Sequence, residues 1–197
     1  MLKSNKTQSE ISIGRDGDVV GGNKYVKNEF INNNYRTRLS RLFEALIAEV
    51  NDETKLEDVC EELNRYLVDK DIIGLEQKLT DGGFSQNFIS DASEQKEMFA
   101  KKMYKFRNYE SAQFIYVELL AVIKTTFLDL IFPLIEEEVS KKEILQSVRE
   151  KIIEPINERL NKEGAEDTIL NLNSEEIRGM VYYLTGRCHI KWNYDNI

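Results

Sequence analysis

The chain has 197 residues, of which 41% are hydrophobic and 31% charged, and its formal net charge is −8. A chain of this length can bury the core of one domain, and it is shorter than most enzymes that hold cofactor and substrate on separate domains. Its single His and two Cys exclude two-His metal sites, paired-His catalysis and four-cysteine zinc sites. We therefore expect no metal and no cofactor. The few cysteines and the lack of a secretory leader indicate a cytoplasmic protein.

The first 36 residues differ in composition from the rest of the chain. They carry six Lys or Arg and four Asp or Glu, a net charge of +2, whereas residues 37–197 carry −10. Short β-branched runs separated by Asp16-Gly17 and Gly21-Gly22 predict a β-hairpin over residues 11–26. An isolated hairpin is marginal in water. We therefore expect this tail to dock on the domain or to self-associate, with these candidate residues: Ile11, Ile13, Val19 and Val20.

Residues 37–197 show helical periodicity. Apolar residues spaced three and four apart predict helices over 39–50 and 56–67, which a short turn at 51–54 would join as antiparallel neighbours. A short helix over 72–79 should end at Gly82-Gly83, and a weaker pattern predicts another over 84–106. Cys60 lies on the apolar stripe of the second helix, so we interpret it as a core residue.

The most apolar segment runs from 111 to 135. Glu118, Lys124 and Asp129 interrupt it, and each would be costly in a bilayer, so we predict a central core helix and no membrane span. Pro133 should kink or end this helix, and Pro155 should bend the next one, over 141–160.

The last predicted helix begins near residue 173, where Asn173 and Glu176 have the spacing of a capping box, and Gly186 is its expected C-cap. The whole pattern predicts a mostly α fold. We expect a bundle of about six to seven helices over 37–197, preceded by a short Gly-rich β-hairpin tail over 1–36.

Few residues suggest catalysis. Cys188 and His189 are adjacent, but neighbouring side chains seldom face each other, so a Cys-dependent hydrolase is an alternative that we do not favour. Cations interleave with aromatic residues between Lys101 and Arg107, a pattern that can bind single-stranded nucleic acid. Because the chain is acidic, we do not expect direct nucleic-acid binding, and a nucleic-acid-binding regulator is kept as an alternative.

The closing segment from Gly179 to Trp192 carries a distinctive run, Tyr182-Tyr183-Leu184-Thr185-Gly186-Arg187-Cys188-His189. This segment resembles the end of C-terminal domains from bacterial ABC-three component conflict systems, and residues 127–135 and 152–156 fit the same helical domain. The resemblance covers about 106–195. Residues 13–24 also resemble Gly/Asp-Val-Val repeats that flank modules in bacterial conflict proteins.

The resemblance implies an interaction domain without catalysis. Such domains usually join an effector to a small middle component and to an ABC-type ATPase of the SMC kind, in defence against phage or plasmids. No segment before residue 106 has the length or the residues of an effector, so we expect a non-enzymatic subunit. Either the effector is a separate polypeptide, or this chain is a regulatory subunit. The candidate partner-contact residues belong to the closing segment: Tyr182, Tyr183, Arg187, His189 and Trp192. Trp192 leads them because tryptophan is a favoured interface anchor, although we favour the alternative that it simply closes the end of the bundle.

Overall fold

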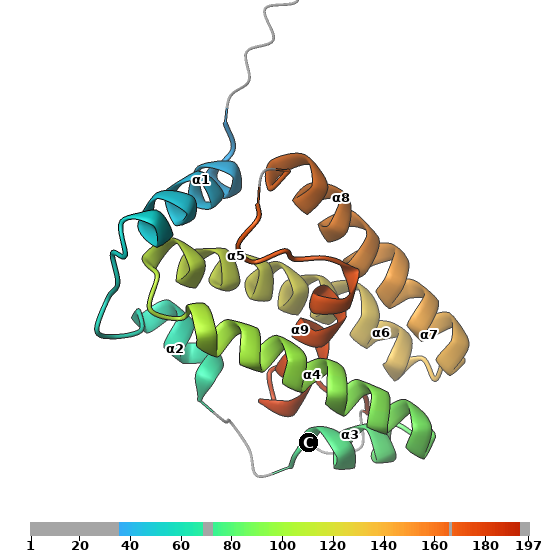
Figure 1. Ribbon diagram of the computed structural model, residues 1–197. Helices are drawn as coiled ribbons and strands as arrows, with labels where there is room; N and C mark the ends of the chain where they lie inside the picture. The colour runs from blue at the N-terminus through green and yellow to red at the C-terminus, as the bar shows by residue number, and fades with distance from the viewer. Residues whose placement is uncertain (1–35, 69–72, 166, 194–197) are drawn as a thin grey trace, which may run out of the picture. The chain divides into compact units, whose positions relative to one another are not determined.

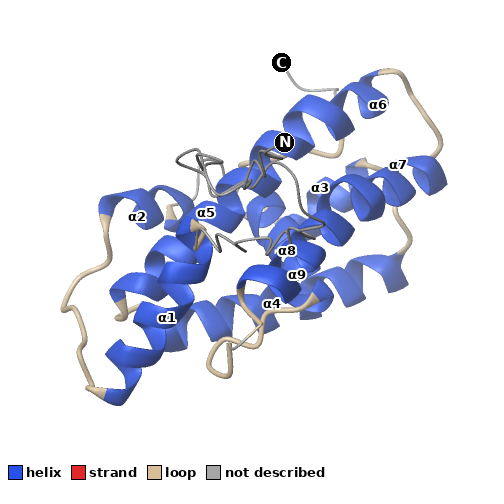
Figure 2. Ribbon diagram, turned by 90° about the horizontal axis from the view of Figure 1, so that it is seen from above, coloured by secondary structure: helices blue, strands red, loops and turns tan. Residues whose placement is uncertain are grey.

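The computed structural model describes residues 36–68, 73–165 and 167–193, and its regular structure there is entirely helical (Figure 2). Because α5, η1 and α6 run without a break, as do α7, η2 and α8, the described residues form seven continuous helices. The elements are α1 (Arg38–Asn51), α2 (Glu61–Leu67), α3 (Leu75–Asp81), α4 (Gln86–Phe106), α5 (Glu110–Thr126), η1 (Phe127–Ile131), α6 (Phe132–Glu136), α7 (Lys141–Val148), η2 (Arg149–Ile153), α8 (Glu154–Glu163) and α9 (Ser174–Gly186).

The mostly helical fold and its number of helices are confirmed. The expected hairpin over 11–26, with Ile11, Ile13, Val19 and Val20, lies outside the described residues, so the self-association of this tail stays a prediction. Within the described ranges, every helix is too short or too polar to span a bilayer.

Helix α9 lies at the centre of the domain, where it packs against α3, α4, α5 and α8 (Figure 1). Its most extensive partner is α4. The capping box predicted at its start is present, since Asn173 and Glu176 bond each other's backbone N–H groups in the expected manner. Most of α9 is buried, including Gly179, whose missing side chain allows the two helices to approach closely.

The two prolines lie inside continuous helices. Pro133 is the second residue of α6 and Pro155 the second residue of α8, and each of these helices directly follows a π-helical turn, η1 or η2. Proline lacks an N–H donor and its ring crowds the preceding turn, which the wider π turn relieves. The helix therefore continues past Pro133 to Glu136 and does not end at the proline.

The second helix begins later than its apolar stripe predicted. Residues 55–60 form a non-helical segment whose backbone bonds side chains and backbone from the α4–α5 region. The buried Gln113 side chain accepts from the Cys60 N–H at 2.6 Å and donates to the Asp58 carbonyl at 3.2 Å and the Arg107 carbonyl at 2.7 Å. These tertiary hydrogen bonds replace the first turn that Leu56, Val59 and Cys60 would have formed, and Cys60 is half-buried.

Four helices end in the same hydrogen-bond pattern, with a left-handed residue after the C-cap. These residues are Glu53 after α1, Gly83 after α3, Glu138 after α6 and Cys188 after α9. In α9 the His189 N–H donates to the Leu184 carbonyl at 2.8 Å and the Cys188 N–H donates to Thr185 at 3.1 Å, as in a Schellman motif. Gly186, the expected C-cap, is instead the last helical residue.

Replacing Glu53 by glycine is expected to raise the free energy of unfolding by about 0.5–1 kcal/mol, because a left-handed non-glycine residue is strained by about 1 kcal/mol. Glu53 has a φ of 54° and is exposed, so little packing is lost. The neighbouring Asp52→Gly variant is the matched control, since Asp52 has a φ of −87° and gains nothing from glycine. Urea unfolding measures the free energy of unfolding of both variants. Equal destabilisation by the two variants would contradict the strain at Glu53.

Candidate functional site

The predicted contact residues are distributed around the C-terminal end of α9. Tyr182 and Tyr183 are consecutive helical residues, so their side chains point in different directions. Tyr182 meets the edge of Phe88 at a ring separation of 6.0 Å, and Tyr183 meets Phe99 at 5.4 Å, so both rings pack on α4. They are only 5% and 2% exposed. The two rings therefore belong largely to the α4–α9 core.

Trp192 closes the end of the bundle. Its indole Nε1 donates to Thr185 Oγ1 at 2.9 Å, and its ring lies edge-on to Phe84 at 5.4 Å and to Phe127 at 5.1 Å. The residue is 4% exposed. The segment after α9 therefore folds back onto the helix through a polar and an aromatic contact. A role of Trp192 in binding a partner stays a prediction.

One edge of Tyr182 and Trp192 faces a cleft of about 300 Å³ between α4, the α7–η2 helix and α9. We call it the aromatic cleft. Its lining residues are Phe88, Asp91, Gln95, Leu145, Val148, Arg149, Ile153, Arg178, Val181, Tyr182 and Trp192. Arg149 bonds Glu154 at 2.8 Å, whereas Arg178 takes part in no ion pair or hydrogen bond within the described residues. The buried Gln95 Oε1 also lacks a hydrogen-bond partner there.

The aromatic cleft changes the titration of Tyr182. Burial raises the pKa of its hydroxyl to about 12, while the nearby Arg178 charge lowers this pKa and the Asp91 charge raises it. Between pH 10 and 12 the unfolded chain loses this proton and the folded chain retains it, so the stability due to Tyr182 is lost as the pH rises.

We therefore expect wild type to lose up to about 2–3 kcal/mol more unfolding free energy than Tyr182→Phe between pH 9 and pH 12. The phenylalanine variant is the matched control because it keeps the ring and removes only the titrating hydroxyl. Urea unfolding followed by circular dichroism measures the difference. Parallel pH profiles for the two proteins would contradict the expectation.

Tyr183 and Arg187 line a second hollow of about 300 Å³, between α2, α4 and the end of α9. We call it the arginine-rimmed hollow. Its lining residues are Leu63, Leu67, Ala100, Met103, Tyr104, Arg107, Tyr183 and Arg187. The Arg187 guanidinium lies over the Tyr183 ring at 5.5 Å, and the Arg107 guanidinium lies over Tyr104 at 4.0 Å. The five predicted residues are thus divided between the two hollows, except His189, which packs on Tyr66.

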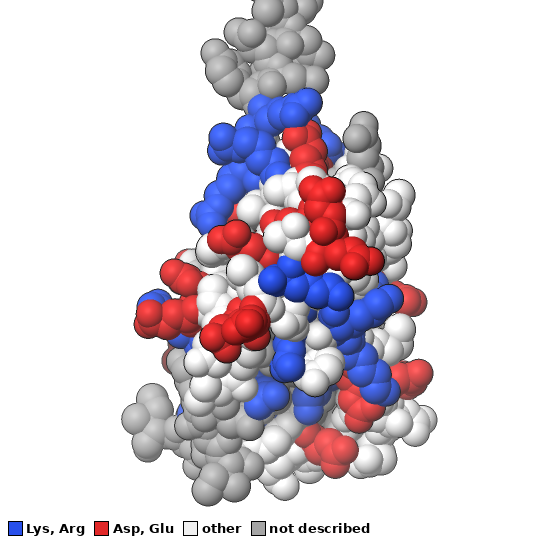
Figure 3. Space-filling view, turned by 60° about the vertical axis from the view of Figure 1, so that its left-hand side comes forward, with Lys and Arg blue, Asp and Glu red and all other residues white. Residues whose placement is uncertain are grey.

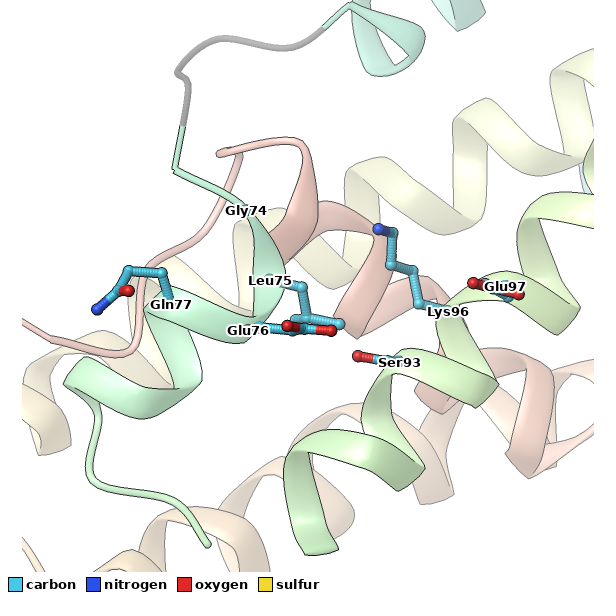
Figure 4. A pocket seen from close by; sticks show the side chains of 7 residues that line it. All are labelled: Gly74, Leu75, Glu76, Gln77, Ser93, Lys96 and Glu97. Carbon is cyan, nitrogen blue, oxygen red and sulfur yellow. The ribbon is translucent and has the colours of Figure 1, made fainter. Parts of the chain in front are cut away.

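A third, polar hollow of about 430 Å³ lies between α3 and α4. Figure 4 shows that Ser93 points from α4 toward α3, while Gln77 points away from the α4 side chains. Its lining residues are Gly74, Leu75, Glu76, Gln77, Ser93, Lys96 and Glu97. The sequence patterns indicated none of these residues, because each is an ordinary polar or helix-forming residue until the two helices are placed side by side.

Comparison with known proteins places this helical domain. Residues 74–192 match the family described as C-terminal domain 9 of the ABC-three component systems, which is more than half of the chain. The chain belongs to this family. It is therefore a component of an ABC-three component conflict system. No curated protein and no solved structure matches it.

The ABC-three component domain begins earlier than the closing motif indicated. The match starts at residue 74 rather than near 106, and it includes α3 and α4. The structure gives the reason, since α9 packs on both of these helices and Gly179 contacts the α4 backbone. A domain without α3 and α4 would expose the buried face of α9.

In this ABC-three component domain, the Cys188 thiol lies next to a buried lysine. Lys78 is 3% exposed, and its Nζ lies 2.6 Å from Cys188 Sγ and donates to the Thr185 carbonyl at 2.6 Å. The Cys188 thiol also donates to the Ile73 carbonyl at 3.4 Å. The His189 ring is 7% exposed and lies against Tyr66 with ring centroids 5.2 Å apart. Sequence reasoning missed Lys78, because a lysine is not expected on the otherwise apolar face of a helix.

The cations between Lys101 and Arg107 have partners within the domain. Lys101 pairs with Glu97 at 3.5 Å, and Lys102 pairs with Glu176. Lys105 lies over the Phe106 ring at 4.8 Å. Figure 3 shows Lys and Arg side chains gathered in a band across one face, bordered by Asp and Glu. Carboxylates thus lie beside much of the positive charge on this face.

Within the described residues, no group of three His, Cys, Asp or Glu could hold a metal ion.

Proposed function

We propose that this chain is a non-enzymatic interaction subunit that couples an effector to the ABC-type ATPase of its system, in defence against phage or plasmids. The observation that carries the proposal is the aromatic cleft. Phe88, Tyr182 and Trp192 line it beside Arg178. Aromatic residues and arginine are the residue types that dominate the binding energy of protein interfaces.

The polar groups of the cleft support a protein partner. Arg178 can donate several hydrogen bonds, and the Asp91 carboxylate can accept them. A peptide segment offers both carbonyl and N–H groups, so it could satisfy donor and acceptor together. The cleft volume of about 300 Å³ is enough for one or two side chains from a partner.

The test is co-purification of the full chain with the ATPase and the small middle component of its system. Arg178→Glu is expected to weaken the association by about tenfold or more, because it removes the donor and places a carboxylate near Asp91. Lys162→Glu is the matched control, since it makes the same charge change on the exposed end of α8 and lines none of the three hollows.

Thermal unfolding of both variants establishes that the fold is kept. Equal weakening by Arg178→Glu and Lys162→Glu would contradict a role of the cleft, since it would reduce the effect to net charge. Full association of the Arg178→Glu protein would contradict it as well.

A further inference from the structure

Lys78 on α3 and Cys188 after α9 lie closer together than a hydrogen bond explains. The Lys78 Nζ is 2.6 Å from the Cys188 Sγ. An N–H···O bond is about 2.9 Å long, and sulfur is a larger atom than oxygen, so an ordinary N–H···S bond is longer than this contact. A single oxygen atom bonded to both the nitrogen and the sulfur would hold them at such a distance, because its two short bonds meet at a bent angle.

Helix capping accounts for only part of this arrangement. Lys78 donates to the Thr185 carbonyl at 2.6 Å, and cations are favoured at the C-terminal end of a helix. However, Lys78 is only 3% exposed, whereas the long stem of a lysine usually lets its ammonium group reach water. The buried nitrogen lies against a nucleophilic sulfur atom, which capping of α9 does not require.

The backbone holds both residues in place. Cys188 is the left-handed residue that follows α9, and its N–H donates to the Thr185 carbonyl at 3.1 Å. Lys78 lies within α3, which packs on α9. Groups held in contact react far faster than the same groups free in solution. Cys188 is half-buried, so a small oxidant can reach its sulfur atom.

We propose that Lys78 and Cys188 are a modification site, at which oxidation by a peroxide joins the two side chains through a nitrogen–oxygen–sulfur bridge. The bridge would link α3 covalently to the end of α9, between residues 110 positions apart in the chain. This inference goes beyond the proposed function, and it depends neither on a partner protein nor on the aromatic cleft.

The reaction consumes two molecules of hydrogen peroxide. The first oxidises the Cys188 thiol to a sulfenic acid and leaves one molecule of water. The Lys78 amine, after releasing its ammonium proton to solvent, then loses one N–H hydrogen, and the sulfenic acid loses its O–H hydrogen as the N–O bond forms. The second peroxide accepts these two hydrogens, its O–O bond breaks, and two more molecules of water result. Nitrogen and sulfur each lose two electrons in the whole reaction.

The experiment measures peptide masses from the full chain after treatment with hydrogen peroxide. Cleavage after glutamates places the two residues on separate peptides, 77–94 and 177–197. We expect a joined pair whose mass exceeds the sum of the two peptides by about 14 Da, because one oxygen enters and two hydrogens leave. Dithiothreitol added before cleavage should remove this pair, because two molecules supply the four electrons that restore the thiol and the amine and release one water.

Variants assign the joined pair to these two residues. Lys78→Met removes the amine and keeps a side chain of similar length, so the joined pair should be lost. Cys60→Ser is the matched control, because Cys60 is the only other cysteine of the chain, and this variant should keep the pair. Thermal unfolding shows whether each variant folds. If Lys78→Met does not fold, Cys188→Ser gives the same test and should also lose the pair.

Four results would overturn the inference. The first is a set of separate peptides that gain only multiples of about 16 Da, the gain of sulfenic or sulfinic acid. The second is a joined pair about 2 Da lighter than the sum of its peptides, the mass of a direct nitrogen–sulfur bond. The others are a joined pair that survives dithiothreitol and one that persists in Lys78→Met. Because the assay uses this chain alone, its outcome leaves the co-purification test of Arg178→Glu intact.

Discussion

Replacing Gly179 by alanine is expected to lower the free energy of unfolding by about 2 kcal/mol, although alanine favours helices by about 1 kcal/mol over glycine. A Cβ at this position would lie 2.6 Å from the Gln95 carbonyl oxygen and 2.9 Å from the Phe99 Cβ. The first of these atoms is helix backbone and cannot move aside without separating α4 from α9. A melting temperature lower by about 4–8 °C is expected for a domain of this size.

Gly186→Ala is the matched control for Gly179→Ala. Both glycines lie in α9, but a Cβ at Gly186 would meet only the flexible end of the Lys96 side chain, at 3.2 Å or more. The control is therefore expected to be neutral or slightly stabilising. A Gly179→Ala protein as stable as the Gly186→Ala protein would contradict the claim that α4 and α9 approach too closely at Gly179 to admit a Cβ.

Replacing Trp192 by alanine is expected to cost about 3–5 kcal/mol, the largest effect among these predictions. The change removes a buried ring from between Phe84 and Phe127 and leaves Thr185 without the indole donor. Trp192→Phe should cost less, because it keeps much of the aromatic contact and loses the hydrogen bond, worth about 1 kcal/mol. Urea unfolding separates the two variants.

The control for Trp192 is Tyr104→Ala, which truncates an exposed aromatic residue and should change stability by no more than about 0.5 kcal/mol. A similar small change for Trp192→Ala would contradict its place in the core. A Trp192→Ala protein that stays folded and keeps full partner binding would remove Trp192 from the proposed interface.

Local patterns in the sequence predicted the helices well. The apolar periodicity indicated each of the seven continuous helices, and the spacing of Asn173 and Glu176 correctly indicated the capping box of α9. The end of α3 was predicted correctly because its left-handed residue is Gly83. The left-handed residues that end α1, α6 and α9 are Glu53, Glu138 and Cys188, so no glycine indicated these positions, and Gly186 indicated the end of α9 two residues too early for its left-handed residue.

Tertiary contacts explain what the patterns missed. The start of α2 depends on hydrogen bonds from Gln113, which lies more than fifty residues away. The candidate sites also depend on tertiary contacts, because the aromatic cleft is lined by residues from α4, α7, η2 and α9. Tyr182 and Trp192 stand out within the closing motif, whereas Arg178 and Gln95 gain significance only when α4 and α9 are paired.

The most direct test of the central claim is site-specific photo-crosslinking in the complex formed with the ATPase and the small middle component. A benzoylphenylalanine placed at Leu145 lies in the aromatic cleft on α7, and one at Thr125 lies on the exposed face of α5. We expect a crosslink to a system component from position 145 and none from position 125. Crosslinks from position 125 alone, with the complex intact, would contradict docking at the aromatic cleft.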